Sequence, residues 1–273
     1  MLCVYGYNYN LNNILKFSFS SMHDDELVVK QNYNKQIEKF LVLKDITWNM
    51  PKFINYVSFS NYAPRFSNTI KKYFVPNSIT LEKRLSSDYF IQFLKQFTNK
   101  EKDYRLAEII IKLVIINAQK QYYEGTSSEY LGIAFMNYQD HFVAEDFFEL
   151  MYHQLIHTLV FIDDILTTQL SNSKKTFKVT TNLPHRGGGN DFRLYVLFHS
   201  YLVGVEILHY RIQNNSLDFI GNYHGNTRKV INKTKGVREA FMGLESQFTP
   251  HGQQIIADYD KTFKDFINQI NVG

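Results

Sequence analysis

Two histidines four residues apart, His153 and His157, are the side chains best suited to chemistry in this 273-residue chain. The pattern of residues 149–164 predicts a helix, and positions i and i+4 of a helix lie one above the other on the same face. Two imidazoles placed in this way can bind one metal ion. The H-x-x-x-H spacing is that of the zinc-peptidase motif, but Gln154 stands where that motif has its glutamate.

The two histidines belong to a polar stripe along the predicted helix. At about 100° per residue, the stripe consists of Asp146, Glu149, His153, His157, Val160 and Asp164. An exposed helix would also be polar on one side, but a solvated face usually carries both signs of charge. Residues 145–173 contain no lysine or arginine. A stripe of histidines and carboxylates without cations favours a metal site or a buried acid–base site.

A third ligand is available on the next long helix, predicted from residue 192 to about residue 212 with Asp191 as its N-cap. Two helices joined by a loop commonly pack antiparallel, which can bring His199 over the pair. Glu206 lies two turns further on the same face and is an alternative ligand. A single buried histidine is more often a hydrogen-bonded core residue, so the third ligand stays open at this point.

Gln154 bears on the reaction class. A hydrolytic zinc enzyme of this type needs a carboxylate at this position to take the proton from the metal-bound water. An amide cannot take that proton, so hydrolysis would require another carboxylate. An iron oxygenase has no such requirement, because its metal activates dioxygen and a co-substrate supplies electrons. Three protein ligands would leave positions for both.

Four segments together resemble a known family: HQLIHTLVFIDD at 153–164, LPHR at 183–186, FR at 192–193 and FHSYLV at 198–203. They look like the 2-oxoglutarate-dependent HExxH-type peptide β-hydroxylases, which act on ribosomally made peptides in natural-product biosynthesis. The resemblance covers roughly residues 145–212. It departs from the family pattern at Gln154, where the family usually has glutamate, and it leaves both histidines in place.

The resemblance implies a set of roles for individual residues. His153, His157 and His199 would bind Fe(II), and no catalytic side chain beyond these ligands is implied. Arg186 or Arg193 would hold the distal carboxylate of 2-oxoglutarate, since a guanidinium pairs with a carboxylate through two hydrogen bonds. Each arginine could instead be a surface charge. The three glycines at 187–189 would form a loop beside the co-substrate or a plain connector.

The resulting prediction is an Fe(II)/2-oxoglutarate-dependent dioxygenase that hydroxylates a side-chain carbon of a peptide. Which peptide it modifies, and whether a leader or a carrier protein presents it, is left open, as is the oligomeric state. Two other classes stay open. The first is a zinc-dependent hydrolase descendant, active or degenerate. The second is a non-catalytic peptide-binding partner in a maturation complex, which would bind no metal stoichiometrically.

Composition narrows the range of partners. A net charge of +4 is too small and too dispersed to indicate nucleic-acid binding. A single cysteine, Cys3, excludes an intramolecular disulfide and fits a reducing compartment. The start of the sequence lacks the pattern of a secretory signal, and the longest apolar run, 109–116, is interrupted by Lys112 and is too short to cross a bilayer. We therefore expect a cytoplasmic protein without a nucleic-acid or membrane partner.

Residue patterns predict one domain over 1–273, of the α+β class and predominantly helical, with the metal site between two long helices. Short strands at 2–5, 14–19 and 26–30 would form a small β-rich part over about 1–32. The helical metal-binding core would span about 140–212. Further helices are expected at 36–43, 81–97, 102–123 and 250–270, with a strand within 130–138 and a loose segment at 213–236.

Overall fold

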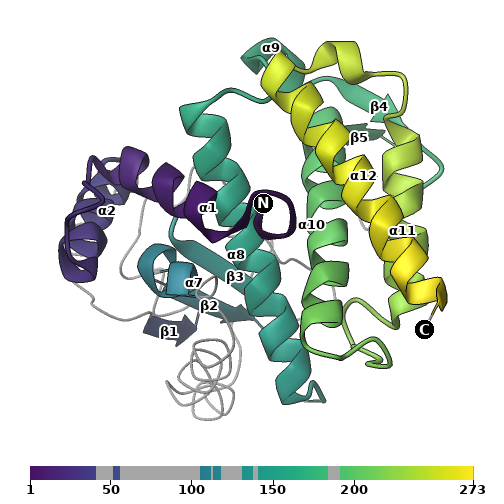
Figure 1. Cartoon of the computed structure of the whole chain (residues 1–273), viewed down its shortest axis with the longest axis horizontal. Coiled ribbons are helices and arrows are strands. Elements are labelled where there is room, and N and C mark those ends of the chain that lie inside the picture. Colours follow the sequence, from purple (N-terminus) through teal and green to yellow (C-terminus); the bar gives the residue numbers. More distant parts are fainter. Residues whose placement is uncertain are drawn as a thin grey trace. The chain divides into compact units, whose positions relative to one another are not determined.

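A computed structural model describes residues 1–40, 52–55, 105–111, 113–117, 131–137, 141–183 and 191–272 (Figure 1). These parts are mostly helical with a few short strands, which confirms the predicted predominantly helical α+β class. None of the helices in these parts is long and apolar enough to cross a membrane. The helix expected at 81–97 lies outside the described residues.

The chain forms two compact units. The first, here called the N-terminal unit, comprises Tyr7–Ile162. The second, the C-terminal unit, comprises Met1–Gly6 together with Asp163–Gly273. The organisation of residues 1–273 as one domain stays a prediction.

The start of the chain is helical, so the predicted β-rich part over 1–32 is wrong. Helix α1 spans Leu2–Ser18 and α2 spans Glu26–Phe40. The buried side chains of α2 include Val29, Tyr33 and Ile37, which follow one another every four residues as a helix requires. The predicted strands were only four to six residues long. Over so few positions, the apolar pattern of a helix cannot be distinguished from that of a strand. Residues 36–40 of the helix predicted at 36–43 form the end of α2, and residues 41–43 lie outside the described residues.

Three parallel strands lie within the N-terminal unit in the order β1–β2–β3. They are β1 (Lys52–Asn55), β2 (Leu113–Asn117) and β3 (Ile133–Asn137), and β3 confirms the strand predicted within 130–138. The helix predicted over 102–123 is wrong at residues 113–117, while residues 102–104, 112 and 118–123 lie outside the described residues. Helix α7 spans Arg105–Ile110, and the segment after it, rich in β-branched residues, forms strand β2. Branching at Cβ favours the extended backbone here over a continued helix.

Helix α8 (Ala144–Leu166) confirms the predicted histidine helix. The carboxylate of Asp146 accepts a hydrogen bond from the backbone N–H of Val143 at 3.0 Å, which fixes the start of the helix. An acidic residue in the first turn is also favourable there because the helix dipole is positive at that end.

The C-terminal unit contains a two-stranded antiparallel sheet and several helices. In chain order these are α9 (Asn172–Lys175), β4 (Lys178–Thr180), β5 (Asp191–Arg193), α10 (Leu194–Gln213), α11 (Thr227–Ala240), the 3-10 turn η3 (Glu245–Gln247) and α12 (Pro250–Val272). Asp191 is not the N-cap of α10, because it pairs with Thr180 in the sheet and Arg193 occupies the cap position. Helix α12 confirms the predicted C-terminal helix.

The segment expected to be loose at 213–236 is irregular over residues 214–226, as predicted, but the prediction is wrong from Thr227 onward, where α11 begins. Asn226 caps the helix by accepting a hydrogen bond from the N–H of Lys229 at 2.8 Å. Val230, Thr234 and Val237 supply a narrow buried face between charged and polar residues. Two valines and a threonine are a weak apolar signal in a sequence rich in lysine and asparagine, so the period is hard to recognise.

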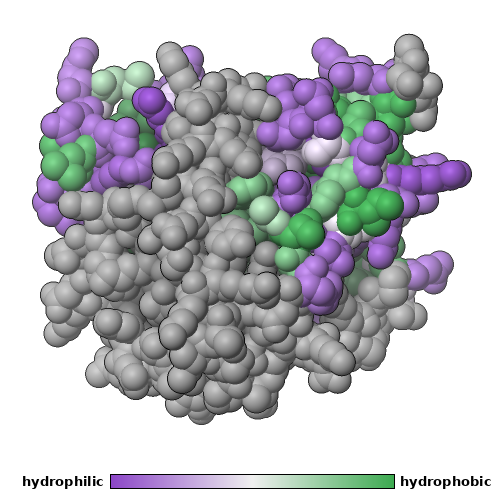
Figure 2. All heavy atoms as spheres, turned by 90° about the horizontal axis from the view of Figure 1, so that it is seen from below, coloured by the Kyte–Doolittle hydropathy of each residue, from purple (hydrophilic) through white to green (hydrophobic). Residues whose placement is uncertain are grey.

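Helices α10, α11 and α12 lie side by side in the C-terminal unit (Figure 1). Asp260 on α12 joins all three, because it accepts hydrogen bonds from the Tyr201 hydroxyl at 2.6 Å and from Nε of Arg238 at 2.8 Å. Figure 2 shows one face of the molecule, where apolar side chains of described residues lie among hydrophilic ones. Exposed apolar side chains that are scattered in this way are common on globular proteins and indicate no particular partner.

Gly204 allows α10 and α11 to approach closely. A Cβ at this position would overlap Oγ1 of Thr234 and lie 3.1 Å from its Cγ2. Thr234 is buried, and its hydroxyl donates a hydrogen bond to the Val230 carbonyl at 2.8 Å, so it cannot easily move aside.

Gly204→Ala should therefore lower the free energy of unfolding by about 1–3 kcal/mol, as overpacked contacts generally do. Gly236→Ala on α11 is the matched control, since the nearby atom is a terminal methyl of Leu183 at 3.2 Å. Urea unfolding measures both. Adding Thr234→Ala to Gly204→Ala should recover part of the loss, and a Gly204→Ala protein as stable as the parent would contradict the close approach.

Candidate metal centre

The polar stripe of α8 is buried. Its carboxylates, Asp146, Glu149 and Asp164, are each at most 4% exposed, as is Asp163 beside them, whereas His153 and His157 are partly exposed. The other faces of the helix are covered as well, with Leu150, Leu155, Leu159 and Ile162 among the buried side chains. This burial argues against a solvated helix face. The carboxylates and histidines lie in a protein interior, where each polar group requires a partner.

The side chains of His153 and His157 point their Nε2 atoms toward each other. Their Nε2 atoms are 3.0 Å apart, and their ring centroids are 4.7 Å apart. Two nitrogen ligands that are each about 2.0–2.1 Å from one ion are roughly 3 Å apart when they occupy adjacent coordination positions. The nitrogen pair therefore fits a single metal ion, and α8 alone sets its spacing.

Burial keeps the His157 ring neutral. Desolvation lowers the pKa of His157 to about 4, and the ring also stacks on Phe161 at a centroid distance of 6.2 Å. A neutral imidazole has a lone pair to offer a metal ion, and near neutral pH no proton competes for it.

Gln154 lies between the two histidines in sequence, and its side chain is fully buried. The hydroxyl of Thr158 donates to the Gln154 backbone carbonyl at 3.0 Å, which holds this turn of the helix. A neutral amide can be buried at lower cost than a carboxylate without a cation. The position that carries the general base in zinc peptidases is here uncharged and unable to act as a base.

His199 belongs to the C-terminal unit, whereas His153 and His157 belong to the N-terminal unit. Its side chain is nearly fully buried on α10, beside the rings of Tyr195 and Phe198. No cluster of three or more His, Cys, Asp or Glu side chains suited to a metal ion occurs within the described residues. The structure brings His153 and His157 together, and His199 as the third ligand stays a prediction.

Glu206, the alternative third ligand, is already engaged within the C-terminal unit. Its fully buried carboxylate accepts hydrogen bonds from the Tyr259 hydroxyl at 2.6 Å and from the backbone N–H of Cys3 at 3.1 Å, and it pairs with the amino group of Met1. A metal ion would have to compete with all three partners. This arrangement favours His199 over Glu206.

The two arginines expected to bind the co-substrate fall in different places. Arg193 is the last residue of β5 and the cap position of α10, and it is exposed and paired across the sheet with Lys178. Arg186 lies outside the described residues, as do His185 and the glycines at 187–189. Both arginine roles therefore stay predictions.

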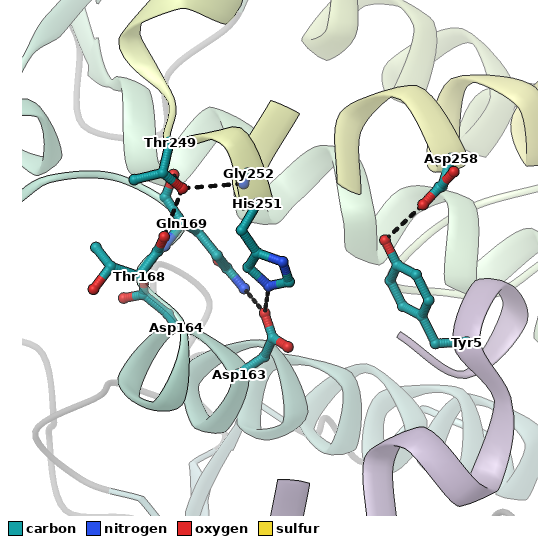
Figure 3. A network of polar contacts seen from close by, with 9 residues as sticks. All are labelled: Tyr5, Asp163, Asp164, Thr168, Gln169, Thr249, His251, Gly252 and Asp258. Atoms are coloured by element: carbon teal, nitrogen blue, oxygen red, sulfur yellow. Dashed lines mark hydrogen bonds and ion pairs between the residues drawn. The ribbon is translucent and has the colours of Figure 1, made fainter. Parts of the chain in front are cut away.

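A polar network within the C-terminal unit joins the last turn of α8 to the start of α12 (Figure 3). Oδ2 of Asp163 lies 2.8 Å from Nε2 of His251 and accepts a hydrogen bond from Nε2 of Gln169 at 2.6 Å. Thr249 supports the same junction, because its hydroxyl donates to the Thr168 carbonyl at 2.6 Å. Also in Figure 3, the Tyr5 hydroxyl donates to Asp258 at 2.9 Å and fastens the start of the chain to α12.

The contact of His251 with Asp163 was not predicted, because the spacing of His251 from the other histidines indicates no shared site. A signal was nevertheless present. Asp163 and Asp164 are adjacent carboxylates near the C-terminal end of a helix, where the helix dipole disfavours negative charge. Such a pair requires compensation from elsewhere in the chain. His251 supplies it to Asp163, and Lys175 forms an ion pair with Asp164.

Comparisons with known proteins add no identification. No protein-family model matches this chain, and no curated protein matches its sequence.

The Asp163–His251 contact should make stability depend on pH. The hydrogen bond to Asp163 raises the pKa of His251, and the charges of Asp163 and Asp164 act in the same direction against the opposing effect of burial. A histidine whose pKa is higher in the folded state stabilises that state fully below its unfolded pKa of about 6.5. The contribution is lost as pH rises through the folded pKa.

His251→Asn should therefore cost most stability below about pH 6.5, and the cost should shrink as the pH is raised above that value. Urea unfolding of parent and variant across this range, with a chelator present, measures the difference. His23→Asn is the control, because His23 is exposed in the turn between α1 and α2. A cost for His251→Asn that is equal at every pH would mean that the contact does not depend on the imidazolium charge.

Proposed function

We propose that this protein is an Fe(II)/2-oxoglutarate-dependent oxygenase that hydroxylates a side-chain carbon of a ribosomally made peptide. The observation that carries the proposal is the pair of imidazoles on α8, whose Nε2 atoms are 3.0 Å apart in a largely buried setting. The resemblance of residues 153–164, 183–186, 192–193 and 198–203 to peptide β-hydroxylases supplies the reaction class. His199 is the proposed third ligand.

The chain's own residues account for the remaining requirements of such a site. His153 and His157 offer two ring nitrogens as ligands, of which His157 is kept neutral by burial, and the buried turns around them limit the access of water. Iron with 2-oxoglutarate and dioxygen supplies the oxidising chemistry that amino-acid side chains lack. Gln154 leaves the site without a general base, as hydroxylation allows. Arg193 or Arg186 would hold the distal carboxylate of the co-substrate.

A zinc-dependent hydrolase is the second candidate, and one observation favours it. Glu149 is a buried carboxylate one turn before His153 on the same stripe, so a carboxylate other than residue 154 is close in the helix. Metal identity and oxygen uptake separate the two classes. Hydrolysis would depend on zinc and proceed without oxygen, whereas hydroxylation would consume oxygen and release succinate. A non-catalytic peptide-binding partner would do neither and would bind no metal stoichiometrically.

The first test is anaerobic titration of the protein with Fe(II). His153→Ala, His157→Ala and His199→Ala should each abolish tight binding while circular dichroism shows a folded chain. His209→Ala is the matched control on the same helix as His199, because its ring stacks on Phe266 instead. A His153→Ala or His157→Ala protein that still binds Fe(II) with unchanged affinity would put the metal site elsewhere.

The second test concerns the co-substrate. A guanidinium that holds a carboxylate with two hydrogen bonds loses that geometry when it is replaced by lysine, although the charge stays. Losing a hydrogen bond to a charged group costs on the order of 1.5–3 kcal/mol. The KM for 2-oxoglutarate should therefore rise roughly tenfold to a hundredfold in Arg193→Lys or Arg186→Lys, measured by succinate release.

We expect the larger effect from Arg193→Lys, because Arg193 directly precedes the helix that carries His199. Arg228→Lys, an exposed substitution in the first turn of α11, is the control and should leave the KM unchanged. An unchanged KM in both Arg193→Lys and Arg186→Lys would remove these arginines from the site and count against the oxygenase itself.

A further inference from the structure

The His199 ring is packed against a tyrosine one helical turn earlier. The centroids of the Tyr195 and His199 rings are 4.1 Å apart with an angle of 48° between the planes. Phe198 contacts the same imidazole edge-on at 5.9 Å. His199 is only 3% exposed, so these neighbours fix how its ring is turned. The side-chain torsion alone does not, because χ2 of histidine has broad, shallow minima.

Tyr195 is itself held by a cation. Nζ of Lys175 lies over the Tyr195 ring at 5.4 Å from its centroid and forms an ion pair with the carboxylate of Asp164. Asp164 is nearly fully buried and accepts a hydrogen bond from the backbone N–H of Gln169 at 2.9 Å. Burial, followed by the charge of Asp164, raises the pKa of Tyr195, so the phenol stays neutral. A continuous line of contacts therefore runs from the end of α8 through Lys175 and Tyr195 to His199.

We propose that Tyr195 is a positioning residue for His199, and that Lys175 keeps Tyr195 in place. The inference rests on the proposed function, in which His199 is a metal ligand. A ligand must present its nitrogen within about half an ångström and some 10–20° of the required direction. Support by residues that do not touch the metal commonly changes metal affinity by 10- to 100-fold.

The chain offers a matched control for the lysine. Lys174 precedes Lys175 in the same short helix, and its Nζ lies 6.0 Å from the Phe177 ring instead of Tyr195. Lys174→Met and Lys175→Met remove the same charge from neighbouring positions. A difference between them reports on the contact with Tyr195 and Asp164, since net charge changes equally in both.

The first measurement uses metal-free protein with isotope-labelled histidine, in which His199→Gln assigns the His199 ring signals. Nuclear Overhauser effects between the His199 and Phe198 rings report the orientation of the imidazole. Tyr195→Phe keeps the aromatic ring and should preserve them, as should Lys174→Met. Tyr195→Leu and Lys175→Met should weaken them and broaden the His199 signals, because the ring samples more than one orientation.

The second measurement is anaerobic Fe(II) titration of the same variants, with thermal unfolding as a check on folding. Tyr195→Leu should bind Fe(II) at least roughly tenfold more weakly, Lys175→Met should also bind it more weakly, and Tyr195→Phe and Lys174→Met should bind it like the parent. A folded Tyr195→Leu protein with unchanged affinity and unchanged His199 contacts would overturn the positioning role while leaving the proposed function intact.

Two further outcomes keep the tests separate. If the parent protein binds no Fe(II), the proposed function fails, and the role of Tyr195 toward a metal fails with it. If Tyr195→Leu does not fold, Lys175→Met against Lys174→Met decides the question. Equal behaviour of the two lysine variants in both measurements would overturn the proposal.

Discussion

Burial of polar groups along one helix is the constraint on which much of this structure depends. Helix α8 carries four buried carboxylates, three of them on the polar stripe that also bears the partly exposed His153 and His157. Burying a charge without a partner costs several kcal/mol, so the rest of the chain has to supply partners. At the end of the helix they are explicit: His251 and Gln169 contact Asp163, and Lys175 pairs with Asp164. The short helix α9 and the start of α12 thus compensate charge on α8.

The same constraint accounts for the protonation state of His157. Two nitrogens 3.0 Å apart cannot both carry protons that point at each other. Either one Nε2–H donates to the lone pair of the other, or both rings carry their proton on Nδ1 and both lone pairs face one point. Desolvation excludes the charged form of His157 near neutral pH. The spacing of the two nitrogens and the neutral state of His157 are therefore both compatible with a metal ion, and they arise from two residues of a single helix.

The sequence was informative where a pattern extends over several turns. Helices α8 and α12 and most of α10 were predictable because apolar residues recur at helical spacing over about twenty residues. Strand β3 was predictable from its alternating apolar residues. Prediction failed where the window was short, at residues 1–32. It also failed where the buried face was narrow, as in α11, and where a β-branched run followed a helix, as in β2. The histidine pair could be predicted because both residues lie on one helix. In contrast, His251 contacts Asp163 across 88 residues of sequence, and Tyr259 contacts Glu206 across 53. No local sequence pattern encodes such contacts.

Glu206 and His199 lie on the same face of α10 but in different environments. The difference bears on which of them is the third metal ligand. Glu206 is saturated by Tyr259, Cys3 and Met1, so its charge serves to hold the start of the chain in the C-terminal unit. His199 lies beside the rings of Tyr195 and Phe198, which exclude water and constrain the plane of the imidazole. An aromatic setting costs a neutral imidazole little and would be costly for a carboxylate. The environments along α10 therefore give Glu206 a structural role, and they are compatible with the proposed role of His199 as a ligand.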